Sequence, residues 1–430
     1  YNKMLISELE VQTPALNWPN YFASIGLAEI EDVNVAMPGF FGEVNAMITE
    51  IPVEDWKIYL KWNVLNQSAP YLSSDFVNSN FEFYGQFLSG KKVIQPRWKR
   101  VIQTEDYALG EAVGQMFVEK HFPPAARERM LELVGNLKTA LGERIDQLEW
   151  MSDVTKTEAH EKLATINVKI GYPDKWRDYS GLEVKEDSYF KNVMRASEFN
   201  QAYRISKIGK PVDPDEWGMT PQTVNAYYSP SRNEIVFPAG ILQPPFFYME
   251  ADDAVNYGAI GVVIGHEMTH GFDDQGRKYD KQGNLTDWWT EDDARRFNER
   301  TKVLTDQFNS FTVLDSVPAN GELTLGENIA DLGGLNIAFT ALKKAWESHP
   351  PKPEINGYTP EQRFFLAYAH VWAQNITNKE ILRRTKEDVH SLGKYRVNGP
   401  LPNMKEFYDA FGITETSEMY IAEEKRASIW

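Results

Sequence analysis

The stretch VVIGHEMTHGFDD, residues 262–274, combines an apolar run with two histidines four positions apart. On a helix, a step of four residues leaves the imidazoles of His266 and His270 about 40° apart, so both can reach one metal ion. Glu267 projects about 100° away from His266, which suits activation of a water molecule better than metal binding. The pattern H-E-x-x-H therefore predicts a helical zinc-binding motif, and the alternative is a pair of buried structural histidines.

A catalytic zinc ion takes three protein ligands and leaves one position open, so a third ligand is expected elsewhere. The segment GENIAD, residues 326–331, is predicted to begin a helix that runs to about Trp346. Its four-residue step puts Glu327 and Asp331 on one face, where the first could bind the metal and the second could orient His266. Most Glu-x-x-x-Asp steps are solvated helix surface, so this pattern alone is weak.

Two carboxylates follow the motif by about one helical turn. Asp273 or Asp274 could accept the second ring N–H of His270 and fix its tautomer. The apolar residues 260–264 before the motif would bury the preceding turn. Both features favour a metal site over a pair of structural histidines.

The rest of the chain has the pattern of a mainly helical protein with one hairpin. Residues 125–150 and 156–170 carry apolar side chains at three- and four-residue steps, and further helices are expected from Asn256 through His270 and from Glu361 to about Ala373. VNAYYSPSRNEIVF, residues 224–237, has a strand, turn, strand pattern that predicts a β-hairpin. A polar, proline-rich segment near residue 210 predicts two lobes, residues 1–209 and 210–430.

Composition excludes several classes of protein. The chain has 430 residues, 42% of them hydrophobic, which is typical of a globular protein with more than one core. A formal net charge of -17 disfavours nucleic acid and anionic membrane surfaces as partners. No apolar run is long enough to span a bilayer, and the residues that follow Tyr1 lack the pattern of a signal peptide; removal of an anchor or export signal upstream of Tyr1 stays open. The absence of cysteine excludes disulfides, thiol nucleophiles and cysteine-bound zinc.

Several blocks of the sequence resemble the neprilysin family of zinc metallopeptidases, which includes endothelin-converting enzyme and bacterial oligopeptidase O. They occur in the family's order: VNAYY at 224–228, IVFPAGILQPPFF at 235–247, VIGHE at 263–267 continuing to Asp274, DWW at 287–289, GENIAD at 326–331, DVHS at 388–391, and Trp430. Weaker matches, YNKM at 1–4 and KIGYPD at 169–174, extend the resemblance over essentially the whole chain.

The resemblance implies a mainly α fold with a small β-sheet. Residues 210–430 would form a thermolysin-like catalytic lobe, and residues 1–209 a helical cap that helps to enclose a chamber and exclude folded proteins. It also implies one Zn²⁺ per chain with Glu327 as the third ligand. Asp331 and Asp273 would orient the two histidines, and Glu267 would be the general base and then the proton donor.

The resemblance further implies a zinc-dependent endopeptidase that cleaves short peptides on the amino side of large hydrophobic residues. Asn225 and Ala226 would hold the substrate backbone, and His390 would donate a hydrogen bond to the developing oxyanion. Arg396 would hold a substrate carbonyl or the region of Asp388. The apolar pocket for the substrate side chain would be formed by Phe246, Val262, Val263, Val371 and Trp372.

Two departures from the family lead to further expectations. Family members are longer, so we expect a separate N-terminal fragment of the same enzyme as a partner chain. The lack of cysteine points to a bacterial-type member, because the extracellular animal members are rich in disulfides. Cysteine usage leaves the compartment undecided, and we expect the cell envelope or secretion rather than the cytoplasm. Two other classes stay open: a peptidase-like binding module that does not cleave, and a structural zinc site, which would need a fourth protein ligand.

Overall fold

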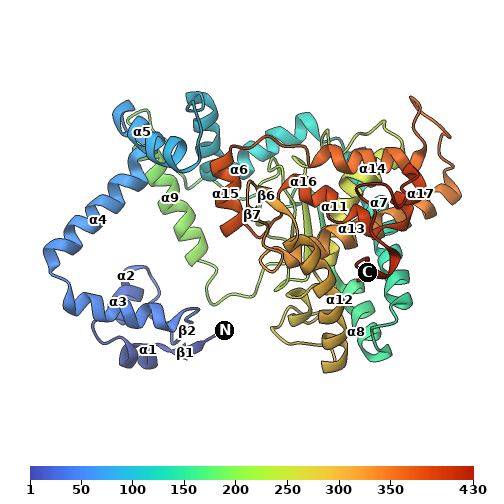
Figure 1. Ribbon diagram of the computed structural model, residues 1–430. Helices are drawn as coiled ribbons and strands as arrows, with labels where there is room; N and C mark the ends of the chain where they lie inside the picture. Colours follow the sequence, from blue (N-terminus) through green and yellow to red (C-terminus); the bar gives the residue numbers. More distant parts are fainter. The chain divides into compact units, whose positions relative to one another are not determined.

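The computed structural model describes residues 1–430, and the chain folds into two compact units. The smaller unit contains residues 1–87, 92–108 and 178–213, and the larger contains residues 88–91, 109–177 and 214–430. Both consist mainly of helices with small sheets, which confirms the predicted fold class (Figure 1).

The smaller unit is a set of helices with one two-stranded antiparallel sheet, in which Met4 pairs with Val33. Its elements are β1 (Lys3–Leu5), α1 (Ile6–Gln12), α2 (Trp18–Ser24), β2 (Asp32–Asn34), α3 (Pro38–Glu50), α4 (Val53–Ser68), α5 (Ser74–Asn80), most of a π-helical segment (Phe81–Leu88), the first half of α6 (Arg97–His121) and α9 (Tyr189–Ile205). Helices α3, α4 and α5 have no fully buried residue, so this unit has little core of its own.

The larger unit holds most of the hydrophobic core. Its main elements are α7 (Pro124–Gln147), α8 (Asp153–Thr165), β3 (Asn167–Gly171), β4 (Tyr227–Ser229), β5 (Glu234–Pro238), α10 (Asp253–Asn256), a π-helical segment (Tyr257–Gly261), α11 (Val262–Thr269), α12 (Glu291–Asn309), β6 (Thr312–Leu314), β7 (Val317–Pro318), α13 (Leu325–Ser348), α14 (Pro360–Val371), α15 (Asn378–Glu387), α16 (Gly393–Asn398) and α17 (Lys405–Phe411). Helix α13 packs against α7, α11 and α12.

The expected division into residues 1–209 and 210–430 differs from the observed one in the short segments 88–91 and 210–213 and, mainly, in the segment 109–177. This segment belongs to the larger unit because the apolar face of α7, which includes Met130, Leu137 and Ile145, is buried in that unit's core. Amphipathic periodicity shows that a helix has an apolar face, but it does not show which element covers that face.

The predicted hairpin is present and forms part of a three-stranded sheet in the order β3-β5-β4. Strands β4 and β5 are antiparallel, with Tyr228 opposite Ile235, whereas β3 runs parallel to β5 with Val168 opposite Ile235. The helix predicted for residues 156–170 is wrong at its end, because α8 stops at Thr165 and residues 167–171 form β3. Strand β4 lies at an edge of this sheet.

The helix that carries the H-E-x-x-H motif begins at Asp253 and runs through α10 and the π-helical segment into α11. The carboxylate of Asp252 caps it by accepting the N–H of Ala254. All eight residues of α11 are buried, so the motif stands on a rigid, enclosed element. The other two predicted helices are also confirmed, as α13 and α14.

Helices α11 and α13 approach closely at a pair of glycines. A Cβ atom on Gly334 would lie 2.6 Å from the carbonyl oxygen of Val262 and 2.7 Å from the backbone nitrogen of His266. A Cβ on Gly265 would lie 2.9 Å from the Cα of Gly334. The missing side chains therefore allow the two backbones to touch, two turns after Glu327 on α13.

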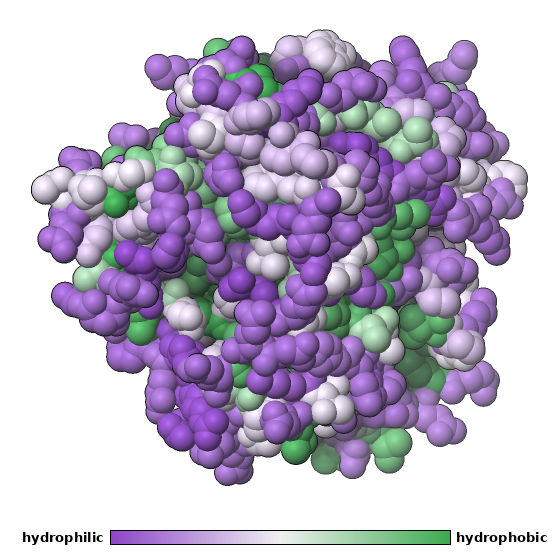
Figure 2. Space-filling model, turned by 90° about the vertical axis from the view of Figure 1, so that its right-hand side faces the viewer, coloured by the Kyte–Doolittle hydropathy of each residue, from purple (hydrophilic) through white to green (hydrophobic).

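The face drawn in Figure 2 is mainly hydrophilic, with apolar side chains in separate patches. No helix in the structure combines the length and the apolar character needed to cross a membrane.

Replacement of Gly334 by alanine should lower the free energy of unfolding. In an ordinary helix, replacement of glycine by alanine raises the free energy of unfolding by up to about 1 kcal/mol. Overpacking against α11 typically costs about 1–3 kcal/mol, so we expect a net loss of stability. Gly135 on α7 is the matched control, because a Cβ there meets nothing within 4 Å. Urea denaturation should show a loss for Gly334→Ala and a gain for Gly135→Ala; equal gains would contradict the close contact.

Candidate metal centre

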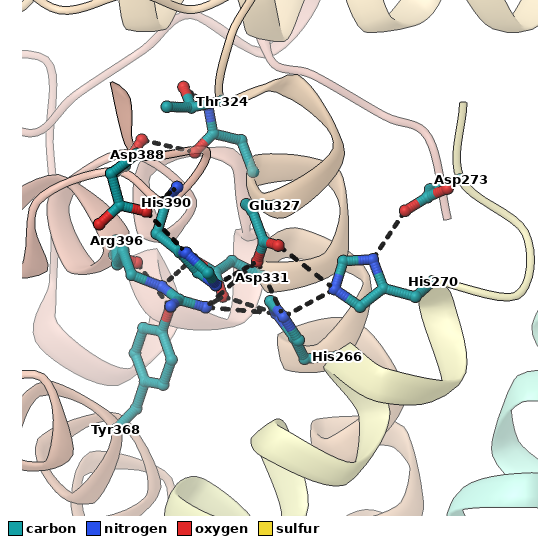
Figure 3. Close-up of polar contacts among 12 residues, drawn as sticks. His266, His270, Asp273, Thr324, Glu327, Asp331, Tyr368, Asp388, His390 and Arg396 are labelled. Atoms are coloured by element: carbon teal, nitrogen blue, oxygen red, sulfur yellow. Dashed lines mark hydrogen bonds and ion pairs between the residues drawn. The ribbon is translucent and has the colours of Figure 1, made fainter. Parts of the chain in front are cut away.

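Two helices bring three ligand atoms together. His266 lies on α11, His270 directly follows that helix, and Glu327 lies in the first turn of α13 (Figure 3). The two Nε2 atoms are 3.0 Å apart, and Glu327 lies 3.1 Å from His266 Nε2 and 3.7 Å from His270 Nε2. These three side chains form the group that could hold a metal ion, with all three ligand atoms within 4.8 Å of one another.

The spacing fits a tetrahedral zinc ion. Bonds of 2.0–2.2 Å at tetrahedral angles place the ligand atoms about 3.3–3.6 Å apart, close to the observed 3.0–3.7 Å. The buried Oε2 of Glu327 has no hydrogen-bond donor, although His266 Nε2 is nearby, as expected for acceptors turned toward one cation. The group contains no fourth protein ligand, which argues against the structural zinc site.

Carboxylates hold the outer nitrogens of both histidines. Asp331 Oδ1 lies 2.9 Å from His266 Nδ1, and Asp273 Oδ2 lies 2.7 Å from His270 Nδ1. Asp273 Oδ1 also accepts the N–H of Gly276 at 2.7 Å, which fixes the carboxylate on the turn. With each Nδ1–H donated to a carboxylate, both Nε2 lone pairs face the position of the metal.

The side-chain partner of Arg396 is Asp331 and not the expected Asp388. Its guanidinium pairs with Asp331 through Nε to Oδ2 at 2.8 Å and through NH2 to Oδ1 at 2.6 Å, and not with Asp388. The guanidinium stacks on the ring of Trp372, 3.7 Å from its centroid. The physical reason is charge balance, because the carboxylate of Asp331 is 1% exposed and needs a buried cation. Direct contact between Arg396 and a substrate stays a prediction.

Glu267 and His390 complete the polar surroundings. Glu267 on α11 is 7% exposed, and no protein side chain pairs with its carboxylate. His390, in the loop between α15 and α16, is half-exposed, and its Nε2 lies 3.4 Å from Glu327 Oε2. The carboxylate of Asp388 holds it by accepting both its backbone N–H and its Nδ1–H at 2.9 Å.

The predicted substrate residues lie on three elements. Asn225, which is exposed, and Ala226, which is buried, directly precede the edge strand β4. The carbonyl of Phe246 accepts the N–H of Ile260, next to the first turn of α11. That turn contains Val262 and Val263, both buried, whereas Val371 and Trp372 end α14 and are partly buried. Their grouping in one pocket stays a prediction.

Several functional contacts were missed by sequence reasoning. Ser391 Oγ donates to Asn328 Oδ1 at 2.8 Å and so ties the loop of His390 to α13. Ser391 directly follows His390 in the chain, and Asn328 directly follows Glu327. Their positions beside two predicted site residues could have indicated this contact. Tyr368 donates to the backbone oxygen of Arg396 at 2.5 Å, and nothing in the apolar sequence of α14 indicated this.

In the metal-free cluster, the charged neighbours strongly shift the pKa values of His266 and Glu327. Burial alone would lower the pKa of His266, but the carboxylates of Asp331 and Glu327 raise it to about 10. Burial would raise the pKa of Glu327, yet the imidazoles of His266 and His270 hold it well below its usual range. A proton shared in this cluster therefore competes with the metal ion.

The metal-free chain should lose stability as the pH rises. The pKa of His266 increases from 6.5 to about 10 on folding, so its stabilising proton is fully present below pH 6.5 and is lost toward pH 10. Urea denaturation with a chelator should give a falling free energy of unfolding across this range. The zinc-loaded chain, in which the metal replaces the proton, should fall less; a flat metal-free profile would contradict the assignment.

Comparisons with known proteins match the chain to a family of peptidases. Two models described as peptidase family M13 match residues 1–173 and 225–427. An endothelin-converting enzyme homolog of Locusta migratoria is 36% identical over 97% of this chain, which spans 60% of that relative. The zinc metalloprotease ZMP1 of Mycobacterium tuberculosis, solved with an inhibitor, has a TM-score of 0.95 and 41% identity over 100% of this chain and 66% of its own. PEPO of Lactobacillus rhamnosis has a TM-score of 0.92 and 31% identity over the same shares.

These matches confirm the resemblance to the neprilysin family. This chain spans about 60% of the length of the curated relative from locust. The donor set and spacing of the His-His-Glu group fit Zn²⁺. The chain belongs to peptidase family M13.

Proposed function

We propose that the protein is a zinc-dependent endopeptidase that hydrolyses short peptides. The observation that carries this proposal is the three-ligand group of His266, His270 and Glu327 in a chain of peptidase family M13. The group has no fourth protein ligand, and an unpaired carboxylate, Glu267, follows the first histidine. A metal held only for stability needs neither feature.

Each polar residue of the centre has a distinct part in the proposed hydrolysis. Zinc, when bound, would lower the pKa of a water molecule and polarise the peptide carbonyl. Glu267 accepts the proton of the attacking water and returns it to the leaving amine. Asp331 and Asp273 keep both histidines in the tautomer that presents Nε2.

His390 is proposed to stabilise the negative charge that develops on the carbonyl oxygen. Asp388 holds its Nδ1, and Nε2 is turned toward Glu327, on the ligand side of the centre (Figure 3). A proton on Nε2 would be donated to the substrate oxygen. Removal of one such donor typically costs about 3–4 kcal/mol of transition-state stabilisation.

The edge strand β4 offers a place for the peptide backbone. One side of β4 pairs with β5, and an extended peptide can add to the other side. Asn225 is exposed just before this strand, where its amide can bond to the peptide backbone. The apolar residues Phe246, Val262, Val263, Val371 and Trp372 would then receive a large hydrophobic side chain, so that cleavage occurs on its amino side.

A separate N-terminal fragment is also proposed as a partner. Helix α4 exposes Val53, Ile58, Leu60, Trp62 and Val64, each between 56% and 66%. Apolar side chains gathered at this density usually mark a surface that another chain covers. Intact mass and subunit content of the purified protein test this, and a homogeneous single chain of this sequence would contradict it. A secreted or envelope location stays a prediction.

Replacement of Glu267 by glutamine should separate metal binding from turnover. The variant should keep one zinc per chain but lose turnover by about 10²- to 10⁴-fold, because the general base is gone. His266→Ala should lose both zinc and turnover, and Glu299→Gln, on the exposed face of α12, should change neither. Metal analysis and hydrolysis of a peptide rich in hydrophobic residues measure this. Near-normal turnover of Glu267→Gln would refute the base, and zinc-loaded wild type that binds peptide without cleavage would favour the binding module.

Replacement of Asn225 by alanine should weaken substrate binding. Loss of one neutral hydrogen bond of about 0.5–1.5 kcal/mol corresponds to a rise in KM of about 2- to 10-fold with a small change in kcat. Asn298→Ala, at an exposed position of α12, is the matched control. Steady-state kinetics on the same peptide decide the matter, and an unchanged KM would remove Asn225 from the binding site.

A further inference from the structure

Lys162 is a buried lysine close to the metal centre but outside its polar network. It lies on α8 and is 1% exposed. Its Nζ donates to the carbonyl oxygens of Gly276 at 2.8 Å and Tyr279 at 2.6 Å. These two residues belong to the turn of residues 276–279, which contains a short 3₁₀ helix (Gly276–Lys278) and follows His270 closely in the chain.

The turn is coupled directly to a ligand of the metal. Its first N–H, from Gly276, donates to Asp273 Oδ1 at 2.7 Å, and Asp273 Oδ2 holds His270 Nδ1 at 2.7 Å. A Cβ on Gly276 would lie 1.8 Å from the carbonyl oxygen of His270, so the turn packs against the backbone of the ligand itself. A displacement of the turn therefore moves both Asp273 and His270.

The ammonium is held in an unusual environment. The rings of Tyr228, Phe272 and Trp288 surround it with centroids 5.9, 5.8 and 5.5 Å from Nζ. No carboxylate makes an ion pair with it, and burial lowers its pKa to about 7 although Asp273 and Asp280 attract the charge. The desolvation of this side chain is thus costly, and a lysine with a perturbed pKa near a site is a candidate for a functional role.

We propose that Lys162 is a positioning residue of the metal centre: by holding the carbonyls of Gly276 and Tyr279 it fixes the turn that sets Asp273 on His270. The inference rests on the proposed zinc site and goes beyond it, because the polar contacts of Lys162 are to the carbonyls of Gly276 and Tyr279 and not to the metal ligands. Residues that orient metal ligands typically contribute about 10- to 100-fold in metal affinity.

A purely structural lysine is the competing explanation, and the chain provides a matched control for it. Lys169 on β3 is 7% exposed and pairs with Glu234, which is 1% exposed, at 2.7 Å. Lys169→Met also removes a buried ammonium and should destabilise the same unit. It leaves the turn of residues 276–279 and Asp273 untouched.

The test compares zinc affinity in the full chain. Wild type, Lys162→Met and Lys169→Met are titrated with zinc against a competing chelator, and the melting temperature of each metal-free protein is recorded. We expect both variants to melt earlier, but only Lys162→Met to bind zinc at least about 10-fold more weakly. At saturating zinc, the kcat of Lys162→Met should differ from that of wild type by a smaller factor than its zinc affinity does.

The outcomes separate this inference from the proposed function. Zinc affinity of Lys162→Met within about 2-fold of wild type, or an equal loss in Lys169→Met, would overturn the positioning role. Failure of wild type to bind zinc would instead overturn the proposed function. If Lys162→Met does not fold, Lys162→Gln, whose amide retains one donor for the turn, should still lose more zinc affinity than Lys169→Met; an equal loss in the two variants would overturn the positioning role.

Discussion

The close contact between α11 and α13 is the constraint on which the rest of the site depends. Without side chains at Gly265 and Gly334, the two backbones touch, and this fixes the first turn of α13 beside the motif. Glu327 and Asp331 then reach the two sides of one imidazole, His266, from a single helix face. A sequence of two ordinary amphipathic helices would keep the axes about 8–10 Å apart and could not guarantee this meeting.

Charge explains why the centre requires a cation. Four carboxylates, those of Glu267, Asp273, Glu327 and Asp331, stand in or beside it, and Arg396 is the buried guanidinium that balances one of them. The two Nε2 atoms face each other at 3.0 Å. In the metal-free protein, the carboxylates of Asp331 and Glu327 hold a proton on His266 and raise its pKa to about 10. Metal binding and proton release are thus one event.

The sequence could predict the parts of this site that depend on local periodicity. The four-residue step brings His266 on α11 and His270, the C-cap residue of that helix, to one metal position, and the step from Glu327 to Asp331 puts two carboxylates on one face of α13. The pairing of Arg396 with Asp331 was not predictable, because it joins residues 65 positions apart through a fold that the pattern does not contain. The parallel strand β3 was missed for a related reason: the alternation of Val168 and Ile170 is too short to be distinguished from the end of an amphipathic helix.

The edge strand and the metal centre belong to one packed body, and this has a consequence for substrate alignment. The ring of Tyr228 on β4 lies 3.5 Å from the position that a Cβ on Gly271 would occupy, directly after His270. Its hydroxyl donates to Asn233, which in turn donates to the backbone oxygen of Lys162. A peptide that paired with β4 would therefore be held at a fixed distance from the ligands, because strand, turn and ligand helix share the same core contacts. The register in which the peptide pairs with β4 would then decide which peptide bond reaches Glu267. No movement of elements within the larger unit would be needed.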